Sequence, residues 1–198
     1  DQGASSAAAT LATDSLPVGY PLVEVVGTLN GCDNAGDTAF TVHVKPIPNV
    51  LLTASNTSIC EGDTVVFTGF NADMYQFSID GLVQGPYSPT DSLVTGSLLN
   101  GQVVSVEGKL SGCENVGDTS YTMNVNLLPT TAFVSSDQDN SICEGDTITF
   151  TASGADLYTF YLDGFSLGTS PTNTISTDTF TVNHQITLKG ESLFGCAV

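Results

Sequence analysis

The residues of this chain with the greatest capacity for chemistry are five cysteines, and they recur in two sequence motifs. The first motif, Ser-Ile-Cys-Glu-Gly-Asp-Thr, contains Cys60 and returns with Cys143 at a spacing of 83 positions. The second motif, Gly-Cys, contains Cys32, Cys113 and Cys196. The sequence has no Cys-x-x-Cys pattern of the kind typical of redox and zinc sites. The repeated positions therefore predict disulfide partners in an oxidising compartment.

Carboxylates accompany both cysteine motifs and introduce a second candidate chemistry. They are Glu61, Asp63, Glu114, Asp118, Glu144 and Asp146. Oxygen ligands crowded in this way could hold Ca²⁺ where two copies of the motifs meet. The alternative is turn chemistry, because Asp and Gly are the residues that tight turns require. The sequence lacks an Asp-x-Asp-x-Asp ladder, and it predicts no other cofactor.

The sequence contains no constellation typical of an enzyme. The two histidines, His43 and His184, have no nucleophile beside them and are expected on the surface, and the chain has no arginine. Acyl, phosphoryl and glycosyl transfer need such paired groups. Asp80 and Asp163 occupy equivalent turns of different sequence repeats, so they cannot flank one glycosidic bond. We therefore predict a non-enzymatic protein.

The charge of the chain limits its partners. The formal net charge is −18, and Lys45, Lys109 and Lys189 are the only basic side chains. Such a charge repels nucleic acid and anionic membranes. No apolar run approaches the roughly 20 residues that span a bilayer, and the first residues do not resemble a signal peptide. We predict no nucleic-acid partner and no membrane insertion of this segment, with any targeting element outside it.

The cysteine motifs are anchors of a longer internal repeat. Tyr-x-Phe before Asp-Gly occurs at Tyr75 and again at Tyr158, with the same offset as the first cysteine motif. The anchors divide the chain into the C-terminal half of one repeat (1–46), a complete repeat (47–128) and a repeat lacking its last strand (129–198). Self-similarity at this period predicts an array of small domains. The sequence is therefore expected to be a segment of a longer protein.

The elements that carry these residues are predicted to be short β-strands. Apolar residues alternate with polar ones around Val65, Tyr75 and Val104, and helical periodicity is absent. Asp80-Gly81 and Asp163-Gly164 predict type I′ hairpins. The pattern is typical of an all-β protein built from tandem Ig-like, Greek-key β-sandwich domains, with a β-solenoid as the alternative. Short proline-containing junctions between the repeats favour an end-to-end rod.

This architecture leaves two disulfide arrangements open. Equal spacings of 53 residues would pair Cys60 with Cys113 and Cys143 with Cys196 inside single domains. In an Ig-like sandwich, however, those positions lie at opposite ends, roughly 25 Å apart, whereas bridged Cα atoms lie about 4.4–6.8 Å apart. We favour a bridge across the junction, from Cys60 to Cys196. Cys32, Cys113 and Cys143 would then have partners outside the segment or stay unpaired.

The motifs together resemble those of a known family of surface proteins. Ile-Cys-Glu-Gly-Asp-Thr opening a strand, Tyr-x-Phe before Asp-Gly, and Gly-Cys-x-Asn before a Thr-rich strand are similar to the tandem Ig-like or PKD-like repeats of gliding-motility adhesins of Bacteroidetes. The resemblance implies type IX secretion, an extracellular location on the bacterial cell surface, and a filament that takes part in cell adhesion and gliding motility. The chain departs from PKD domains in having no tryptophan.

Asp-Ser/Thr-apolar triplets look like the O-glycosylation acceptors used in Bacteroidetes. The acceptor residues would be Ser15, Thr38, Thr64, Ser92 and Thr147. Of these, Ser15 and Ser92 are expected to be better exposed than Thr64 and Thr147. The alternative is chance, because a three-residue pattern arises often in a Thr-rich β-protein.

The function expected from these features is that of a stalk segment in a large secreted surface adhesin. Its partners would be neighbouring repeats of the same chain, while other parts of the full protein would contact the substratum or a polysaccharide. Two alternatives remain. The repeats could bind polysaccharide through aromatic residues such as Tyr87 or Tyr161, or they could form an accessory region of a secreted hydrolase.

Overall fold

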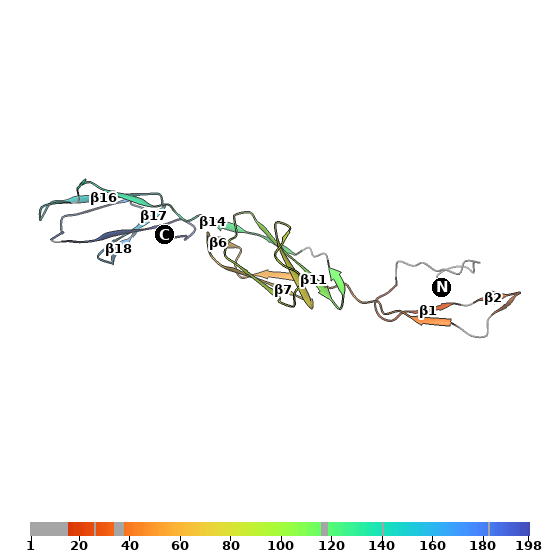
Figure 1. The fold of residues 1–198 in the computed structure, drawn as a ribbon. Helices are drawn as coiled ribbons and strands as arrows, with labels where there is room; N and C mark the ends of the chain where they lie inside the picture. Colours follow the sequence, from red (N-terminus) through yellow and green to blue (C-terminus); the bar gives the residue numbers. More distant parts are fainter. Residues whose placement is uncertain (1–15, 26, 34–37, 116–118, 140, 182) are drawn as a thin grey trace.

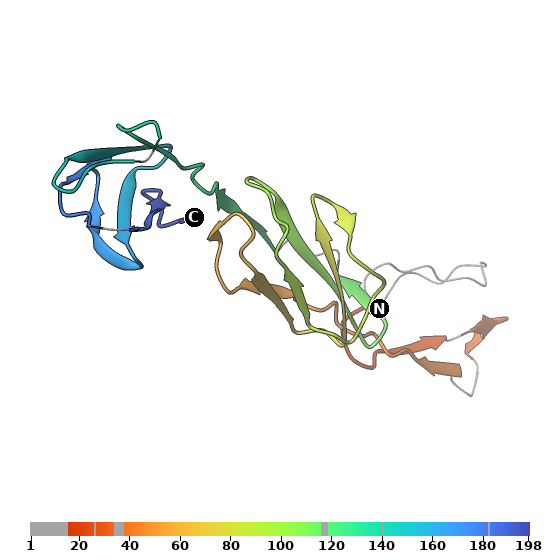
Figure 2. The same cartoon turned by 60° about the vertical axis from the view of Figure 1, so that its left-hand side comes forward.

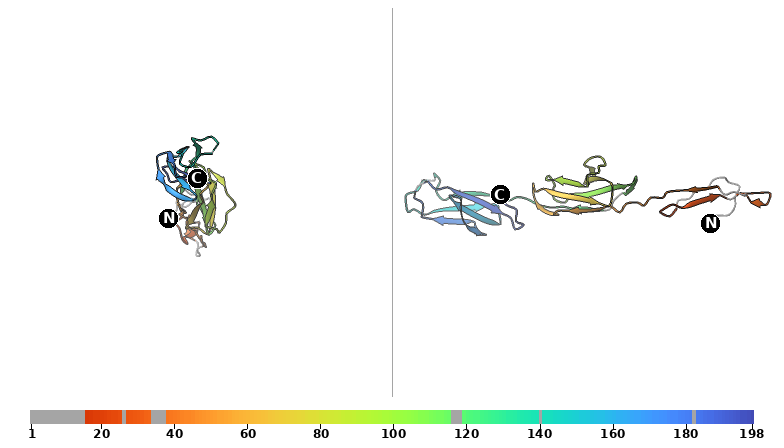
Figure 3. Two further views of the ribbon diagram at one scale, coloured as in Figure 1. Left: turned by 90° about the vertical axis from the view of Figure 1, so that its left-hand side faces the viewer. Right: turned by 90° about the horizontal axis from the view of Figure 1, so that it is seen from below.

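A computed structural model describes residues 16–25, 27–33, 38–115, 119–139, 141–181 and 183–198. Among these residues the regular elements are β-strands, and no helix occurs, which confirms the all-β prediction. The strands form three parts in a line: an N-terminal segment (residues 16–46), a central unit (47–128) and a C-terminal unit (129–198) (Figures 1 and 3). The molecule is therefore an extended rod.

Within the described residues there is no helix that would reach across a bilayer.

The central unit consists of two antiparallel sheets with a common core. One sheet has the order β10-β7-β5, formed by β5 (Leu51–Ala54), β7 (Val65–Phe70) and β10 (Ser92–Thr95). The other contains β8 (Met74–Ile79), β9 (Leu82–Val83), β11 (Val103–Leu110), β12 (Cys113–Asn115) and β13 (Ser120–Thr122), in the order β12-β11-β8-β9 with β13 also on β11.

The core of the central unit follows from the alternation of apolar residues along its strands. Phe67 of the first sheet and Val104 and Val106 of the second are 0% exposed. Each apolar side chain of this size contributes about 1.5–3 kcal/mol when it is fully buried. The period-two pattern seen in the sequence thus marks the inward face of each sheet.

A parallel strand pair closes the central unit at the end nearest the C-terminal unit. It joins β6 (Ser58–Cys60) to β14 (Asn124–Asn126). The Asn124 amide donates to the Thr57 carbonyl at 2.8 Å, which anchors the start of this pair. The chain then passes from β14 directly into the C-terminal unit (Figure 2).

The C-terminal unit has the same two types of sheet. One is β15 (Ala132–Ser135), β16 (Ile148–Ser153) and β19 (Thr174–Thr177), and the other is β18 (Phe165–Ser170), β17 (Leu157–Leu162) and β20 (Ile186–Glu191). Its core is a separate cluster that includes Phe150, Tyr158 and Phe160. Among the described residues of this unit, no strand takes the place that β13 and β14 have in the central unit.

In the N-terminal segment a short hairpin lies in the sequence between two strands that pair with each other. β1 (Leu22–Val25) pairs with β4 (Thr38–Thr41), and β2 (Thr28–Leu29) pairs with β3 (Cys32–Asp33). Its apolar side chains are largely open to solvent, with Phe40 64% and Leu22 57% exposed.

The two Asp-Gly turns have the backbone expected from the sequence. Asp80 and Gly81 have φ values of 50° and 75°, and Asp163 and Gly164 have 51° and 84°. Two consecutive positive φ values are the requirement of a type I′ hairpin. They connect β8 to β9 and β17 to β18.

A buried tyrosine holds the loop before β8 in the central unit and the loop before β17 in the C-terminal unit. The Tyr75 hydroxyl donates to the Ala72 carbonyl at 2.8 Å and accepts from the Ala72 amide at 3.1 Å. Tyr158 makes the same two bonds to Ala155, at 2.6 Å and 3.1 Å.

The Tyr75→Phe variant tests how much the two hydrogen bonds of the Tyr75 hydroxyl contribute to the stability of the central unit. It leaves two backbone groups of Ala72 without their partner, so we expect a loss of about 1–3 kcal/mol in the stability of the central unit. Denaturant titration of wild type and variant measures it. Tyr158→Phe is the matched control, because it should lower the transition of the C-terminal unit instead. Unchanged transitions in both variants would contradict the structural role of these hydroxyls.

The disulfide-bridged junction

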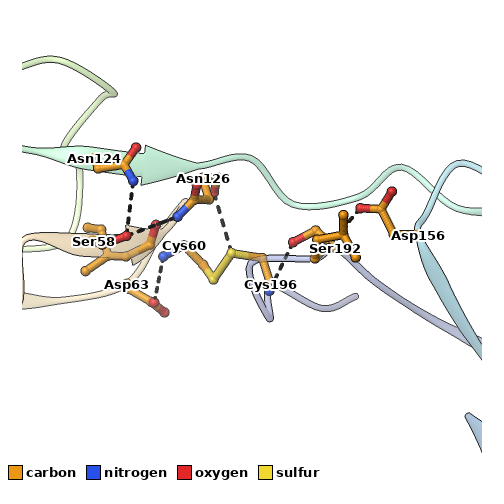
Figure 4. The surroundings of a disulfide bond; sticks show 10 residues. Ser58, Cys60, Asp63, Asn124, Asn126, Asp156, Ser192 and Cys196 are labelled. Atoms are coloured by element: carbon orange, nitrogen blue, oxygen red, sulfur yellow. Dashed lines mark hydrogen bonds between the residues drawn. A yellow bond between two sulfur atoms is a disulfide. The ribbon is translucent and has the colours of Figure 1, made fainter.

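One disulfide joins the central unit to the C-terminal unit. It links Cys60 to Cys196 across a sequence separation of 136, with the Cα atoms 5.5 Å apart (Figure 4). This distance lies in the range usual for disulfides. The bond is the cross-junction alternative of the sequence analysis, and the intradomain pairs Cys60–Cys113 and Cys143–Cys196 are not formed. The intradomain alternative is therefore wrong for this structure, because Cys113 follows the far end of the long strand β11.

The Cys60 side of the bridge is held by a strand and a turn. Cys60 ends β6, and the chain turns at Gly62, which has a φ of 87°. The Asp63 carboxylate accepts from the Cys60 amide at 3.0 Å, while the Asp63 amide donates to the Cys60 carbonyl at 3.0 Å. The acidic motif thus fixes the cysteine backbone at the end of the central unit.

The Cys196 side is a compact turn after β20. The Ser192 hydroxyl accepts from the Cys196 amide at 3.2 Å, and the Ser192 amide donates to the Cys196 carbonyl at 2.8 Å. Asp156 anchors the turn from the neighbouring loop by accepting from the Leu193 amide at 3.0 Å. Cys196 is only 1% exposed, so the bridge is shielded on this side.

Asn126 lies at the junction where both the polypeptide and the disulfide connect the central unit to the C-terminal unit. Its carbonyl oxygen accepts from the Glu61 amide at 2.9 Å and lies 3.8 Å from Cys196 Sγ (Figure 4). Its side-chain amide donates to the Ile59 carbonyl at 3.2 Å. Residues 127–131 then lead into β15. The two units are therefore connected by two covalent links that run side by side.

At the other end of the central unit, hydrogen bonds connect residues 45–48, where the N-terminal segment ends, to residues 111–115. Lys45 Nζ donates to the Ser111 carbonyl at 2.6 Å, and the Asn115 side chain donates to the Pro48 carbonyl at 2.5 Å. Cys113 begins β12 at this same end and is half-buried. Cys113, Cys32 and Cys143 are free thiols, the last two exposed.

The acidic residues considered as calcium ligands have different surroundings in the structure. Asp63 and Asp146 each accept the amide of their cysteine, and Glu114 forms an ion pair with Lys109. Glu61 and Glu144 are exposed beside them. Asp118 lies outside the described residues. No group of three or more Asp, Glu, His or Cys side chains among the described residues is arranged for a metal ion.

The candidate glycosylation residues differ in accessibility from what the sequence led us to expect. Thr64 and Thr147 are exposed, whereas Ser92 is half-buried because it lies in β10 opposite Thr68 of β7. Ser15 lies outside the described residues. Thr38 begins β4, and its side chain is likewise not described. The expectation that Ser92 is better exposed than the two threonines was wrong.

His184 has a structural partner that sequence reasoning missed. Its Nδ1 lies 2.7 Å from the Asp163 carboxylate, just as Gln102 of the central unit donates to Asp80 at 3.0 Å. The pKa of the Asp163 carboxyl is lowered from its ordinary value by the hydrogen bond from the Gln185 amide and then by the bond to His184. His184 thus braces a hairpin turn. The available signal was an Asp-Gly turn followed by a polar residue, 22 positions after Asp80 at Gln102 and 21 positions after Asp163 at His184.

The pH dependence of the C-terminal unit tests this brace. A lowered pKa in the folded state means that the ionised Asp163 stabilises the unit above its unfolded pKa of about 4. We therefore expect that contribution to disappear as the pH falls from about 4 through the folded value. Thermal melts of wild type and Asp163→Asn should converge at low pH and differ near neutrality. A constant difference at every pH would contradict a role for the charge.

The aromatic residues considered for polysaccharide binding are occupied by other contacts. Lys109 Nζ lies 4.1 Å from the centre of the Tyr87 ring, and the Tyr87 hydroxyl donates to Glu107 at 3.2 Å. Burial, followed by the hydrogen bond to Glu107, raises the pKa of Tyr87. Tyr161 is half-buried in β17 between two paired strands. Lys109 therefore covers one face of the Tyr87 ring.

No protein-family model matches the chain, and no curated protein matches it significantly.

Proposed function

We propose that this chain is a mechanical stalk segment of a large secreted surface adhesin and that it performs no reaction itself. The Cys60–Cys196 bond carries the proposal, because it doubles the covalent connection at the point where two units meet. A junction held by two side-by-side links resists both bending and extension.

The strand order supports an Ig-like assignment of the central unit. Its sheets β10-β7-β5 and β12-β11-β8-β9 correspond to the E-B-A and G-F-C-C′ sheets of an Ig-like sandwich. The parallel pair of β6 and β14 then corresponds to the A′ and G strands. Tandem Ig-like units with short proline-containing junctions are suited to forming an extended stalk.

The resemblance of the repeats to gliding-motility adhesins supplies the cellular setting of the proposal. In that setting the protein is exported by type IX secretion and displayed on the bacterial surface, where it serves adhesion and gliding. Other parts of the full protein contact the substratum or a polysaccharide. The net charge of −18 favours solubility of such an exposed filament.

Small-angle X-ray scattering tests the stalk proposal directly. We expect the oxidised chain to show one narrow distribution of lengths and the Cys60→Ser/Cys196→Ser variant a broader, shorter one, because only the linker then holds the junction. Cys32→Ser is the control and should match wild type. Equal distributions for the bridged and unbridged proteins would count against a stiffening role.

Two further measurements separate the stalk from the alternatives. On a glycan array the oxidised chain should bind nothing, since a stalk needs no ligand, and specific binding would favour a polysaccharide-binding module. Antibodies raised against the chain should label intact cells of the source bacterium. Signal confined to cell lysates would contradict surface display.

A further inference from the structure

The two sulfur atoms of the junction disulfide differ in accessibility. Cys196 closes the turn that begins at Ser192 and is 1% exposed, whereas Cys60 is half-buried at the end of β6. A thiolate that opens a disulfide attacks one of its two sulfurs directly, so the rate depends on access to that atom. The Cys60 sulfur is therefore the one that an incoming thiolate can reach.

Carboxylates accompany this accessible sulfur. The Asp63 carboxylate accepts from the Cys60 amide at 3.0 Å, which places its charge beside the cysteine (Figure 4). Glu61 follows Cys60 directly in the sequence and is exposed. On the other side of the bridge, the Asp156 carboxylate bonds to the Leu193 amide of the Cys196 turn. A negatively charged reactant is therefore repelled as it approaches Cys60.

The three lysines of the chain have other partners. Lys45 and Lys109 form their polar contacts at the opposite end of the central unit. Lys189 Nζ lies 3.5 Å from the Glu191 carboxylate. Each lysine is thus engaged with a group other than Glu61 or Asp63, and the charge beside Cys60 stays negative.

The surroundings of Cys196 favour closing of the bridge over its opening. Attack on Cys60 makes Cys196 the leaving thiolate, and a negative charge is costly in a buried place. The Asn126 carbonyl oxygen, 3.8 Å from Cys196 Sγ, is placed to accept the hydrogen of the thiol that results. Because its turn holds Cys196 in position, the sulfur remains beside Cys60 and can restore the bond.

We propose that Cys60 is a thiol-exchange site that prefers small thiols with neutral or positively charged substituents over thiols that carry acidic groups. The small thiolate forms a bond to Cys60 Sγ, the Cys60–Cys196 bond breaks, and Cys196 leaves with the electron pair and takes a proton from water. One disulfide replaces another, so no separate oxidant or reductant is consumed. The reverse step expels the small thiol. This inference rests on the bridged junction of the proposed stalk, whose stiffness the exchange would control.

Peptide mapping after brief exposure to cysteamine tests which sulfur is attacked. The three free thiols, Cys32, Cys113 and Cys143, are first replaced by serine, so that only the bridge can react. Acid stops the reaction at successive times. We expect the first product to carry cysteamine on Cys60 and a free thiol at Cys196. Adducts that appear first, or equally, on Cys196 would overturn the proposal.

Two matched variants test the charge preference. Asp63→Asn keeps an oxygen that can accept from the Cys60 amide but removes the charge, and Asp146→Asn makes the same change at the unpaired Cys143. In Asp63→Asn, mercaptoethanesulfonate, an anionic thiol, should open the bridge about two- to fivefold faster than in wild type at low salt. The rate with cysteamine, whose thiolate form has no net charge, should not rise. Asp146→Asn should match wild type with both thiols.

The outcomes separate the exchange site from the stalk. Glu61→Gln removes the second charge without altering the bond from Asp63, so it should reproduce the selective acceleration even if Asp63→Asn lowers stability. Equal acceleration of both thiols, or none, in Glu61→Gln would overturn the charge preference and leave the stalk proposal intact. A starting peptide map without a Cys60–Cys196 linkage would overturn both proposals.

Discussion

Stretching a single molecule from its two ends should extend only a small part of the chain while the Cys60–Cys196 bond is intact. The bond closes a loop with a sequence separation of 136, and tension passes through the sulfurs instead of through the enclosed residues. At about 3.3–3.6 Å per extended residue, reduction should release about 450–490 Å of additional length. Most of the central unit and nearly all of the C-terminal unit are protected from extension in this way.

Force spectroscopy with handles on both termini measures the effect. Oxidised protein should give a short maximal extension, and a reductant added under load should produce the long release. Cys60→Ser should behave like the reduced protein from the start, whereas Cys143→Ser should behave like wild type, because Cys143 is unpaired in the single chain. Full extension of the oxidised protein would show that the bond does not bridge the two units.

Removal of the Phe67 side chain should unfold the central unit more readily than any change on its surface. Phe67 is 0% exposed and lies on β7 between Leu93 of β10 and Ala54 of β5. Truncation of a buried phenylalanine to alanine typically costs about 3–5 kcal/mol, because it removes apolar contacts and leaves a cavity. A unit of this size has a stability of only about 5–15 kcal/mol, so the loss is a large share of it.

Phe70→Ala on the same strand is the matched control. Phe70 is 44% exposed and points to the opposite face, so its truncation should cost well under half as much. Denaturant unfolding followed by tyrosine fluorescence compares the two variants. In both, the transition of the C-terminal unit should stay unchanged, because its core is a separate cluster. Similar losses for Phe67 and Phe70 would mean that the inward face of β7 has been misassigned.

Local features of this protein were predictable because they depend on neighbouring residues. Alternating apolar residues around Val65 and Val104 define strands with one buried face. Asp80-Gly81 and Asp163-Gly164 define hairpins, since both residues of each pair tolerate positive φ. The acidic residues of the cysteine motifs were recognisable as turn residues for the same reason, and calcium binding was the alternative interpretation of Asp63 and Asp146.

Features that join distant segments were not predictable to the same degree. The half-burial of Ser92 results from the pairing of β10 with β7, and the contact of His184 with Asp163 results from the approach of two loops. Neither residue has a neighbour in the sequence that indicates its environment. The parallel pairing of β6 with β14 is likewise a tertiary contact between segments more than sixty residues apart.

The amino-acid sequence by itself determined that this chain is a repetitive, acidic β-protein with cysteines at fixed positions in each repeat, because composition, periodicity and turn chemistry are local. It left two partners open for Cys60. Only the tertiary structure decided for Cys196, since that choice depends on how the end of one unit is placed against the start of the next.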